Sequence, residues 1–234
     1  MRGTGAAASS AAVRLERIPS VAGMRPADAA EHFRDLPGLV LLESARPGRN
    51  ARWSFLTADP LAVLNAPSDG ADPFAEARAT LRRVAPAASS DDGAPTFLGG
   101  LAGYLSYDLG RRFERLPSLA VDDQPLPLLR LALHDWVVAW DRRTGTAWLG
   151  GRAVDGDTGR LERRLAEVRE RLARKKPADR DGVGAPPEAL QFTSGLDRPA
   201  YEAGVEAIRE RIARGDLYQA NLTRRLETSF ASDA

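Results

Sequence analysis

Residues 129–140 read LRLALHDWVVAW, a nearly continuous apolar run that decides the fold of this chain. A second apolar stretch at residues 146–149 follows across residues 141–145, DRRTG, which have turn character. Apolar runs joined by a short glycine-containing turn are typical of a β-hairpin. We therefore expect residues 129–140 and 146–149 to form two neighbouring antiparallel strands.

Further strand-like segments lie toward the N-terminus. Residues 13–18 (VRLERI) alternate apolar and charged side chains, as a half-buried strand does, and residues 39–42 predict a buried strand. Residues 52–57 and 61–65 also have strand character. Residues 97–107 contain three glycines among apolar side chains, which predicts a core strand with close backbone approach. Short strands spaced by turns favour an antiparallel sheet over a doubly wound one.

Helical signals occur in four segments. Residues 26–36 predict a short helix that begins with proline. Apolar side chains recur at spacings of three and four in three longer segments: Phe74, Ala77, Leu81 and Val84; Leu161, Leu165, Val168 and Leu172; and Tyr201, Val205, Ile208 and Ile212. Asp72 and Asp197 are expected N-caps, and Gly215 is expected to end the last helix.

The order of these signals predicts the domain organisation. Residues 1–12 are expected to be disordered, residues 13–174 to form one domain, and residues 175–190 to be a linker. Residues 191–234 would begin a second domain, with a strand over residues 216–227. Because the chain ends soon after that strand, we expect this domain to be truncated.

The composition excludes several classes of function. The net charge of +1 gives no general electrostatic attraction to nucleic acid or anionic membranes. The absence of cysteine excludes disulfides and thiolate chemistry, and two histidines leave little scope for a histidine metal site. No apolar run is long enough for a secretory signal or a membrane span, so a cytoplasmic protein is expected.

Residues 41–55, LLESARPGRNARWSF, are the first candidate site. A strand ending in Glu43 and Ser44, a basic turn and the segment Trp53, Ser54 and Phe55 could together line a small pocket. Carboxylate, hydroxyl and guanidinium groups beside an aromatic wall would suit an amino acid. The alternative is an ordinary hairpin with a solvated turn.

Residues 99–114, GGLAGYLSYDLGRRFE, are the second candidate. Their glycines lack the spacing of nucleotide-binding loops, so they are interpreted as packing glycines. Asp108, Arg111, Arg112 and Glu114 would form a charged corner. This corner is either a solvated turn with weak ion pairs or a binding surface for a partner chain.

Residues 215–226, GDLYQANLTRRL, are the third candidate. On a strand, Gln219, Asn221 and Thr223 would share one face, which is either solvated or lines a polar cavity. His134 lies in an apolar segment and is interpreted as a core histidine rather than a base. The basic segment 160–176 is interpreted as a solvated helix face, because acidic residues are interspersed in it.

Two of these motifs resemble the chorismate-utilising enzymes. They are GGLAGYLSYDLGRRFE and GDLYQANLTRRLE, and LLES at residues 41–44 with RWSF at residues 52–55 fits the same family. The family includes component I of anthranilate synthase and of aminodeoxychorismate synthase. DLGRRFE and YQANLTRR are more similar to the aminodeoxychorismate branch.

The resemblance implies an α+β fold of antiparallel β-sheets with flanking helices, sandwich-like in its N-terminal region. It implies amination of chorismate with Mg²⁺ as cofactor and ammonia from a glutamine amidotransferase subunit, toward folate synthesis. The lysine and magnesium segments of the family do not occur in this sequence and are expected beyond Ala234. We therefore assign no catalytic or metal-binding residue here, and we expect the chain alone to be inactive.

The resemblance also implies an N-terminal tryptophan pocket. By position, Ser44, Trp53, Ser54 and Phe55 match it, with Trp53 where a tyrosine is more usual. Two other functions remain open. One is anthranilate synthase component I, and the other is a non-catalytic domain that binds an aromatic amino acid or docks an amidotransferase.

Overall fold

The computed structural model describes residues 12–44, 46, 48–66, 71–86, 93–115, 117, 122, 126–174 and 191–228. The chain divides into two units, residues 1–177 and 178–234. The expected disordered start, residues 1–12, lies outside the described residues except for Ala12, and the expected linker, residues 175–190, lies wholly outside them.

The first unit is built around a five-stranded antiparallel sheet. Its strands lie in the order β1 (Val13–Arg17), β8 (Thr146–Arg152), β7 (Trp136–Asp141), β3 (Trp53–Thr57) and β2 (Val40–Leu42). Every residue of β7 is buried, as expected for a central strand. β2 was expected to be buried, but it is an edge strand, and Leu42 is 57% exposed. β2 pairs with a single strand, β3, and the apolar run predicted a strand but not how deeply it is buried.

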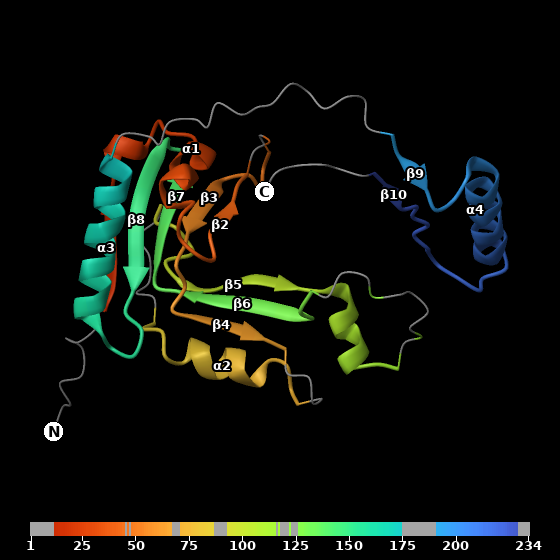
Figure 1. The fold of residues 1–234 in the computed structure, drawn as a ribbon, viewed down its shortest axis with the longest axis horizontal. Helices are drawn as coiled ribbons and strands as arrows, with labels where there is room; N and C mark the ends of the chain where they lie inside the picture. The colour runs from red at the N-terminus through yellow and green to blue at the C-terminus, as the bar shows by residue number, and fades with distance from the viewer. Residues whose placement is uncertain are drawn as a thin grey trace. The chain divides into compact units, whose positions relative to one another are not determined.

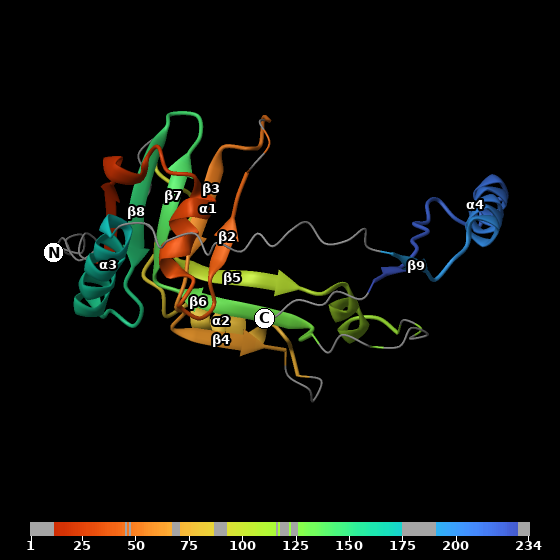
Figure 2. The same cartoon turned by 45° about the horizontal axis from the view of Figure 1, so that its top comes forward.

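A second antiparallel sheet has three strands, in the order β4 (Ala62–Asn65), β6 (Leu129–His134) and β5 (Gly100–Leu105). Figures 1 and 2 show its strands running across those of the five-stranded sheet. In β5, a Cβ atom on Gly103 would lie 2.0 Å from the carbonyl oxygen of Arg130, which confirms the predicted close backbone approach.

The expected single strand over residues 129–140 is therefore wrong: it is two strands in two sheets. β6 and β7 are separated at Asp135, whose carbonyl accepts a hydrogen bond from the Arg152 amide at 2.9 Å. The Asp135 carboxylate is buried, 3.8 Å from Arg164 and 4.0 Å from Arg160. The chain also changes sheets between β3 and β4, where Asp59 has a φ of 50° and pairs with Arg164.

Two helical segments cover one face of the five-stranded sheet. α3 (Thr158–Ala173) contacts β8 and β7, while α1 (Pro26–Ala30) contacts β3 and β2 and continues into η2 (Glu31–Phe33). Their apolar side chains form one core with alternate residues of the strands: Phe33, Leu56, Trp136, Val138, Leu149, Leu161, Leu165, Val168 and Leu172. The predicted stripe of α3 is thus confirmed.

Shorter helices accompany the three-stranded sheet. α2 (Ala75–Leu81) contacts β5, and η3 (Tyr107–Arg112) follows β5. Leu81 was expected in the buried stripe of α2, but it is 48% exposed. The helix ends at Leu81, so the buried stripe is made by Ala77 and Thr80, and Val84 joins Val154 in a β-bridge. Another 3-10 turn, η1 (Pro19–Val21), follows β1.

The second unit contains β9 (Thr193–Ser194), α4 (Arg198–Ala213) and β10 (Leu226–Glu227). The predicted cap is present, since Asp197 accepts a hydrogen bond from the Ala200 amide at 2.8 Å, and Gly215 has a φ of 82°. The expected strand over residues 216–227 is wrong except at β10. A strand needs a neighbour to pair its backbone groups, and β9 offers two residues. The expected polar strand face is therefore not formed.

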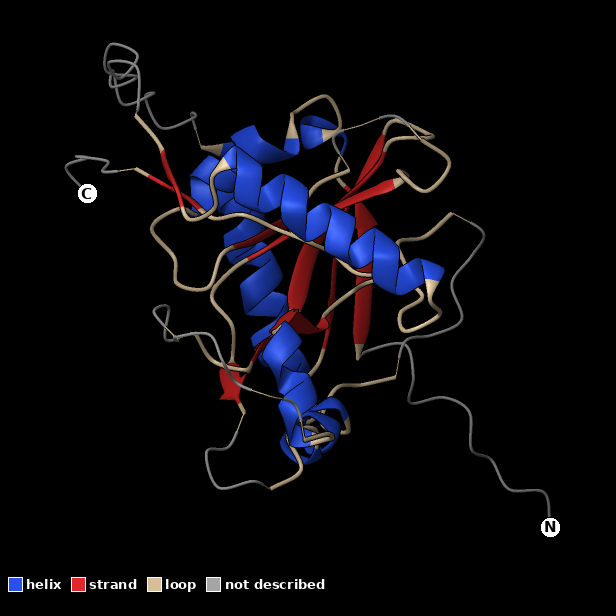
Figure 3. Ribbon diagram, turned by 90° about the vertical axis from the view of Figure 1, so that its right-hand side faces the viewer, coloured by secondary structure: helices blue, strands red, loops and turns tan. Residues whose placement is uncertain are grey.

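Together the sheets and helices make an α+β fold (Figure 3), as the resemblance implied.

Candidate functional site

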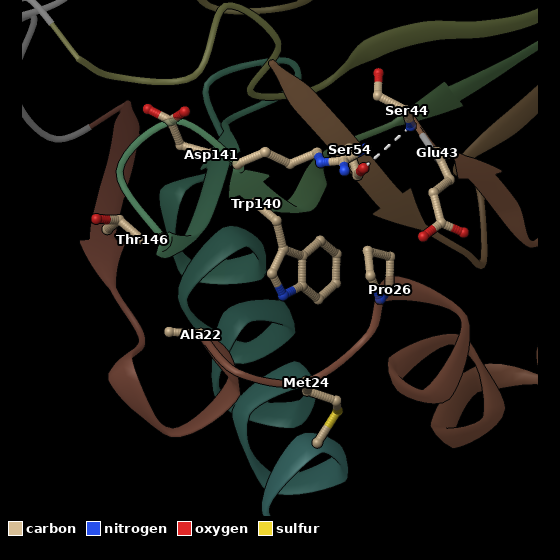
Figure 4. Close-up of a pocket in the computed structure, with 11 residues that line it drawn as sticks. Ala22, Met24, Pro26, Glu43, Ser44, Ser54, Trp140, Asp141 and Thr146 are labelled. Atoms are coloured by element: carbon tan, nitrogen blue, oxygen red, sulfur yellow. Dashed lines mark hydrogen bonds between the residues drawn. The ribbon is translucent and has the colours of Figure 1, made fainter. Parts of the chain in front are cut away.

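A pocket of about 300 Å³ lies at one end of the five-stranded sheet (Figure 4). It is built from the loop before α1, the end of β2, strand β3 and the β7–β8 turn. Its lining residues are Ala22, Met24, Pro26, Glu43, Ser44, Ser54, Trp140, Asp141, Arg142, Gly145 and Thr146. A volume of this size is at the small end of the range for small-molecule sites.

Strand pairing brings the aromatic wall to the serines. Ser54 of β3 is directly opposite Trp140 of β7 in the antiparallel ladder. The Trp140 side chain is buried, and its indole Nε1 donates to the Val21 carbonyl at 3.0 Å, which fixes the ring. Figure 4 shows the rings of Trp140 and Pro26 in the pocket together with the Met24 side chain. One part of the pocket is therefore apolar.

The two serines are held by the hairpin between β2 and β3. The Ser44 amide donates to Ser54 Oγ at 3.2 Å, and the Ser44 hydroxyl donates to the Trp53 carbonyl at 2.9 Å. Each hydroxyl oxygen keeps acceptor capacity, but neither serine is hydrogen-bonded to a base. The arrangement suits binding and lacks the base that an activated serine nucleophile requires.

Two carboxylates border the polar part of the pocket. Asp141 accepts from Arg52 Nη2 at 2.8 Å and from the Arg143 amide at 2.9 Å. Burial raises the pKa of Asp141, but the hydrogen bonds outweigh burial, so the pKa is lowered overall. Asp141 therefore stays ionised and is balanced by Arg52. Glu43 is exposed and forms no ion pair with any described side chain.

The described residues contain no group of three or more His, Asp or Glu side chains that could hold a metal ion. No helix in the described part of the chain is long and apolar enough to cross a membrane.

Comparison with known proteins places the chain in a family. Residues 39–234 match the model of the chorismate binding enzymes. The chain belongs to the chorismate-binding enzyme family. Anthranilate synthase component 1 of Mycobacterium tuberculosis is 34% identical over 218 residues, which covers 82% of this chain and 42% of that protein. Aminodeoxychorismate synthase component 1 of Bacillus subtilis is 27% identical over 206 residues, covering 82% and 43%.

Among solved structures, anthranilate synthase component I of Streptococcus pneumoniae superposes with a TM-score of 0.54 at 20% identity. The match covers 73% of this chain and 40% of that one, and it shows the shared fold. The chain therefore spans less than half the length of the relatives it matches.

Two of the four residues predicted for a tryptophan pocket, Ser44 and Ser54, line the pocket of this family member. Trp53 and Phe55 do not. They alternate with Ser54 along β3 and lie on the opposite face of the sheet, stacked with ring centroids 6.1 Å apart. Phe55 also meets Phe97 edge-on at 5.9 Å. These two rings support the strand that carries Ser54.

Glu43, which was named with Ser44 in the first candidate site, also lines the pocket, but sequence reasoning did not find the remaining residues, notably Met24, Pro26 and Trp140. They come from segments far from residues 41–55 in the chain, and the pairing of β3 with β7 brings Trp140 opposite Ser54. The apolar run at residues 129–140 predicted a strand but did not indicate which strand would pair with it.

The other sequence candidates are placed outside this pocket. His134 is fully buried with its Nδ1 3.1 Å from Thr57 Oγ1, and burial lowers its pKa to about 4. The Thr57 hydroxyl donates to the Trp136 carbonyl at 2.8 Å, so it accepts from His134. The interpretation as a core histidine is confirmed. At the charged corner, Asp108 accepts from Arg111 at 2.8 Å, which is a local surface pair.

Proposed function

We propose that this chain is the N-terminal part of component I of aminodeoxychorismate synthase. The whole enzyme would aminate chorismate to 4-amino-4-deoxychorismate in the cytoplasm, for folate synthesis. The observation that carries the proposal is the family match over residues 39–234. The motifs DLGRRFE at residues 108–114 and YQANLTRR at residues 218–225 support this branch, because they resemble it more than the anthranilate branch.

Anthranilate synthase component I is the second candidate. It is favoured by overall identity, which is 34% to the mycobacterial protein against 27% to the aminodeoxychorismate enzyme of B. subtilis, over the same share of this chain. The two candidates share the substrate and differ in the ring carbon that receives nitrogen.

In either synthase, Mg²⁺ would neutralise the chorismate carboxylate and assist departure of the hydroxyl group. Ammonia would come from a glutamine amidotransferase subunit. The described residues do not fit the metal, because no carboxylate cluster is present among them. No chemical step is therefore assigned to these residues.

The role of the described pocket would be to bind an amino acid. We propose tryptophan, which would be held by its ammonium group, its carboxylate and its indole ring. Glu43 would attract the ammonium group. Ser44 and Ser54 would receive the polar end of the ligand, and Trp140, Pro26 and Met24 would contact the indole. Trp53 and Phe55 would act from the opposite face by holding β3 in place.

The reaction is tested with the whole gene product that carries this chain, incubated with chorismate, Mg²⁺ and ammonia. A product that aminodeoxychorismate lyase converts to para-aminobenzoate supports the first proposal. Direct release of anthranilate with pyruvate supports the second candidate. Absence of any amination contradicts both and favours the non-catalytic binding domain.

Tryptophan binding is tested separately, by calorimetric titration of the 234-residue chain. We expect Glu43→Gln and Ser44→Ala to weaken binding by about tenfold each, since each removes a polar partner worth about 1.4 kcal/mol. Trp53→Phe is the matched variant on the opposite face and should leave the affinity within about twofold. Equal losses of affinity in all three variants would contradict the assignment of the binding site to this pocket. If the unchanged chain did not bind tryptophan, the proposal that tryptophan is the ligand would be wrong.

A further inference from the structure

A second depression, of about 330 Å³, lies beside the first pocket and is dominated by arginine. Gly48, Arg49, Ala51, Arg52, Arg142 and Arg143 line it, and we name it the arginine pocket. It is formed where two loops meet: the loop between β2 and β3, and the turn between β7 and β8.

Backbone hydrogen bonds hold the two loops together. The Arg142 amide donates to the Arg52 carbonyl at 2.9 Å, which joins one loop to the other. Within the loops, Ala51 donates to Gly48 at 3.0 Å, and Gly145 donates to Asp141 at 2.8 Å. The arginines therefore lie on two loops that are hydrogen-bonded to each other at one end of the five-stranded sheet.

The charges of this pocket are not balanced. Arg52 is neutralised by Asp141, and its guanidinium also lies 4.9 Å from the centre of the Trp53 ring. Arg49, Arg142 and Arg143 form no side-chain ion pair with any described residue. Three positive charges thus border one small depression in a chain whose net charge is +1. Clustered like charges repel one another, and an anion between them relieves that repulsion.

We propose that the arginine pocket binds a phosphate group carried by a soluble small molecule. Guanidinium groups match phosphate oxygens with paired N–H donors, and three of them suit a dianion better than a monocarboxylate. The depression is small and confined to two loop ends, which fits a single phosphate group rather than an extended polyanion. No step of the proposed amination is assigned to these arginines.

The test is a calorimetric titration of the 234-residue chain with inorganic phosphate, at constant ionic strength set with chloride. We expect one saturable site, and weaker binding of acetate. The variant Arg49→Gln/Arg143→Gln should weaken phosphate binding by at least about tenfold, because it removes two charge-assisted partners. Arg142 is kept because it also lines the first pocket.

The matched control is Arg82→Gln/Arg163→Gln. It removes the same charge from exposed positions outside both pockets. We expect the control to bind phosphate as the unchanged chain does, and circular dichroism verifies that both variants are folded. Equal weakening in the control would mean general charge attraction and would overturn the proposal, as would the absence of a saturable phosphate site. Acetate binding as tightly as phosphate would also overturn it.

A second arm distinguishes a free phosphate from a lipid headgroup. Vesicles of phosphatidylcholine with phosphatidic acid are sedimented with the chain. We expect the chain to stay in solution while inorganic phosphate still binds. Capture by these vesicles without binding of free phosphate would overturn the assignment to a soluble ligand.

Discussion

Helices α3 and α4 have the same length and the same kind of start, but they differ in what covers them. Each is a 16-residue helix whose N-cap is an aspartate, Asp157 or Asp197. α3 buries four apolar side chains against the five-stranded sheet, whereas α4 buries no residue. Local sequence signals are thus sufficient to specify a helix in both units. Of these two helices, α3 alone is part of a described hydrophobic core.

This difference in burial predicts that the stability of the first unit depends on side-chain packing. An isolated helix of this length is marginal in water, because tertiary burial supplies most helix stability. α4 has its cap and its ion pairs, and Leu222 lies close enough to Gly204 that an added Cβ there would be 2.9 Å from it. All four tryptophans, residues 53, 136, 140 and 148, are in the first unit. Tryptophan fluorescence therefore follows the first unit separately from far-ultraviolet circular dichroism, which reports both helices.

The largest expected effect comes from truncating the buried stripe. Leu165→Ala should reduce the free energy of unfolding of the first unit by about 2–5 kcal/mol, because Leu165 is 2% exposed and the cavity would stay partly empty. Ile212→Ala is the counterpart in α4, where the side chain is 42% exposed, and should change stability by less than about 0.5 kcal/mol. Urea unfolding followed by tryptophan fluorescence and circular dichroism measures both. A similar loss in both variants would remove the contrast between the units.

Close backbone packing gives the second expected effect. In Gly103→Ala, the new Cβ would meet the Arg130 carbonyl oxygen, so β5 must move away from β6 at a cost of about 3 kcal/mol. Gly215→Ala has no atom within 4 Å of the new Cβ and should cost about 1–2 kcal/mol, from its φ of 82° alone. Amide hydrogen exchange, read by segment, should show lost protection in β5 and β6 for the first variant. Unchanged protection there would contradict the close approach.

Buried strand positions also make the first unit sensitive to acid. Burial lowers the pKa of His134 from 6.5 to about 4, so the unfolded chain binds a proton more readily than the folded one. Stability contributed by neutral His134 is present above pH 6.5 and is lost as pH falls toward 4, by up to about 3 kcal/mol. Asp135 opposes this trend, because burial raises its pKa although the charge of Arg164 lowers it. The nearby charge of Asp59 favours protonated His134, and that of Arg164 disfavours it.

His134→Gln tests this directly, since glutamine keeps a donor for Thr57 and does not titrate. Urea unfolding between pH 7 and pH 5, followed by tryptophan fluorescence, should show a shallower fall in stability for the variant. Both histidines lie in the first unit, so no histidine-linked loss is expected for α4. An unchanged slope in the variant would show that other groups govern the acid response.

The two units also show how far sequence reasoning reaches. The stripe Leu161, Leu165, Val168 and Leu172 was predicted in full, because the spacing of a helix is local. The break at Asp135 was missed because the partners of β6 and β7 are distant in the chain. The expected strand over residues 216–227 failed for a related reason. Its residues have strand character, but a strand is formed only where a neighbour is available to pair with it.

The candidate site divides in the same way. Ser44 and Ser54 were found because they lie close together in one motif, with the hairpin between them. Trp140 was missed because the sheet, and not the motif, places it opposite Ser54. Trp53 and Phe55 were grouped with the pocket because they match the family's tryptophan pocket by position, but strand alternation turns them to the other face.

The smallest expected effect separates capping from packing. Asp157→Ala and Asp197→Ala each remove a side-chain acceptor for one backbone amide, with partner distances of 2.8 Å in both helices, and each should cost about 1 kcal/mol. In α3 the buried stripe would hold the helix, so its circular dichroism should stay unchanged while the unfolding midpoint falls. In α4 no buried side chain compensates, so part of the helical signal should be lost before unfolding begins. Hydrogen exchange that is equally fast in the first turns of both variants would contradict this, because it would mean that burial of α3 does not protect the start of the helix.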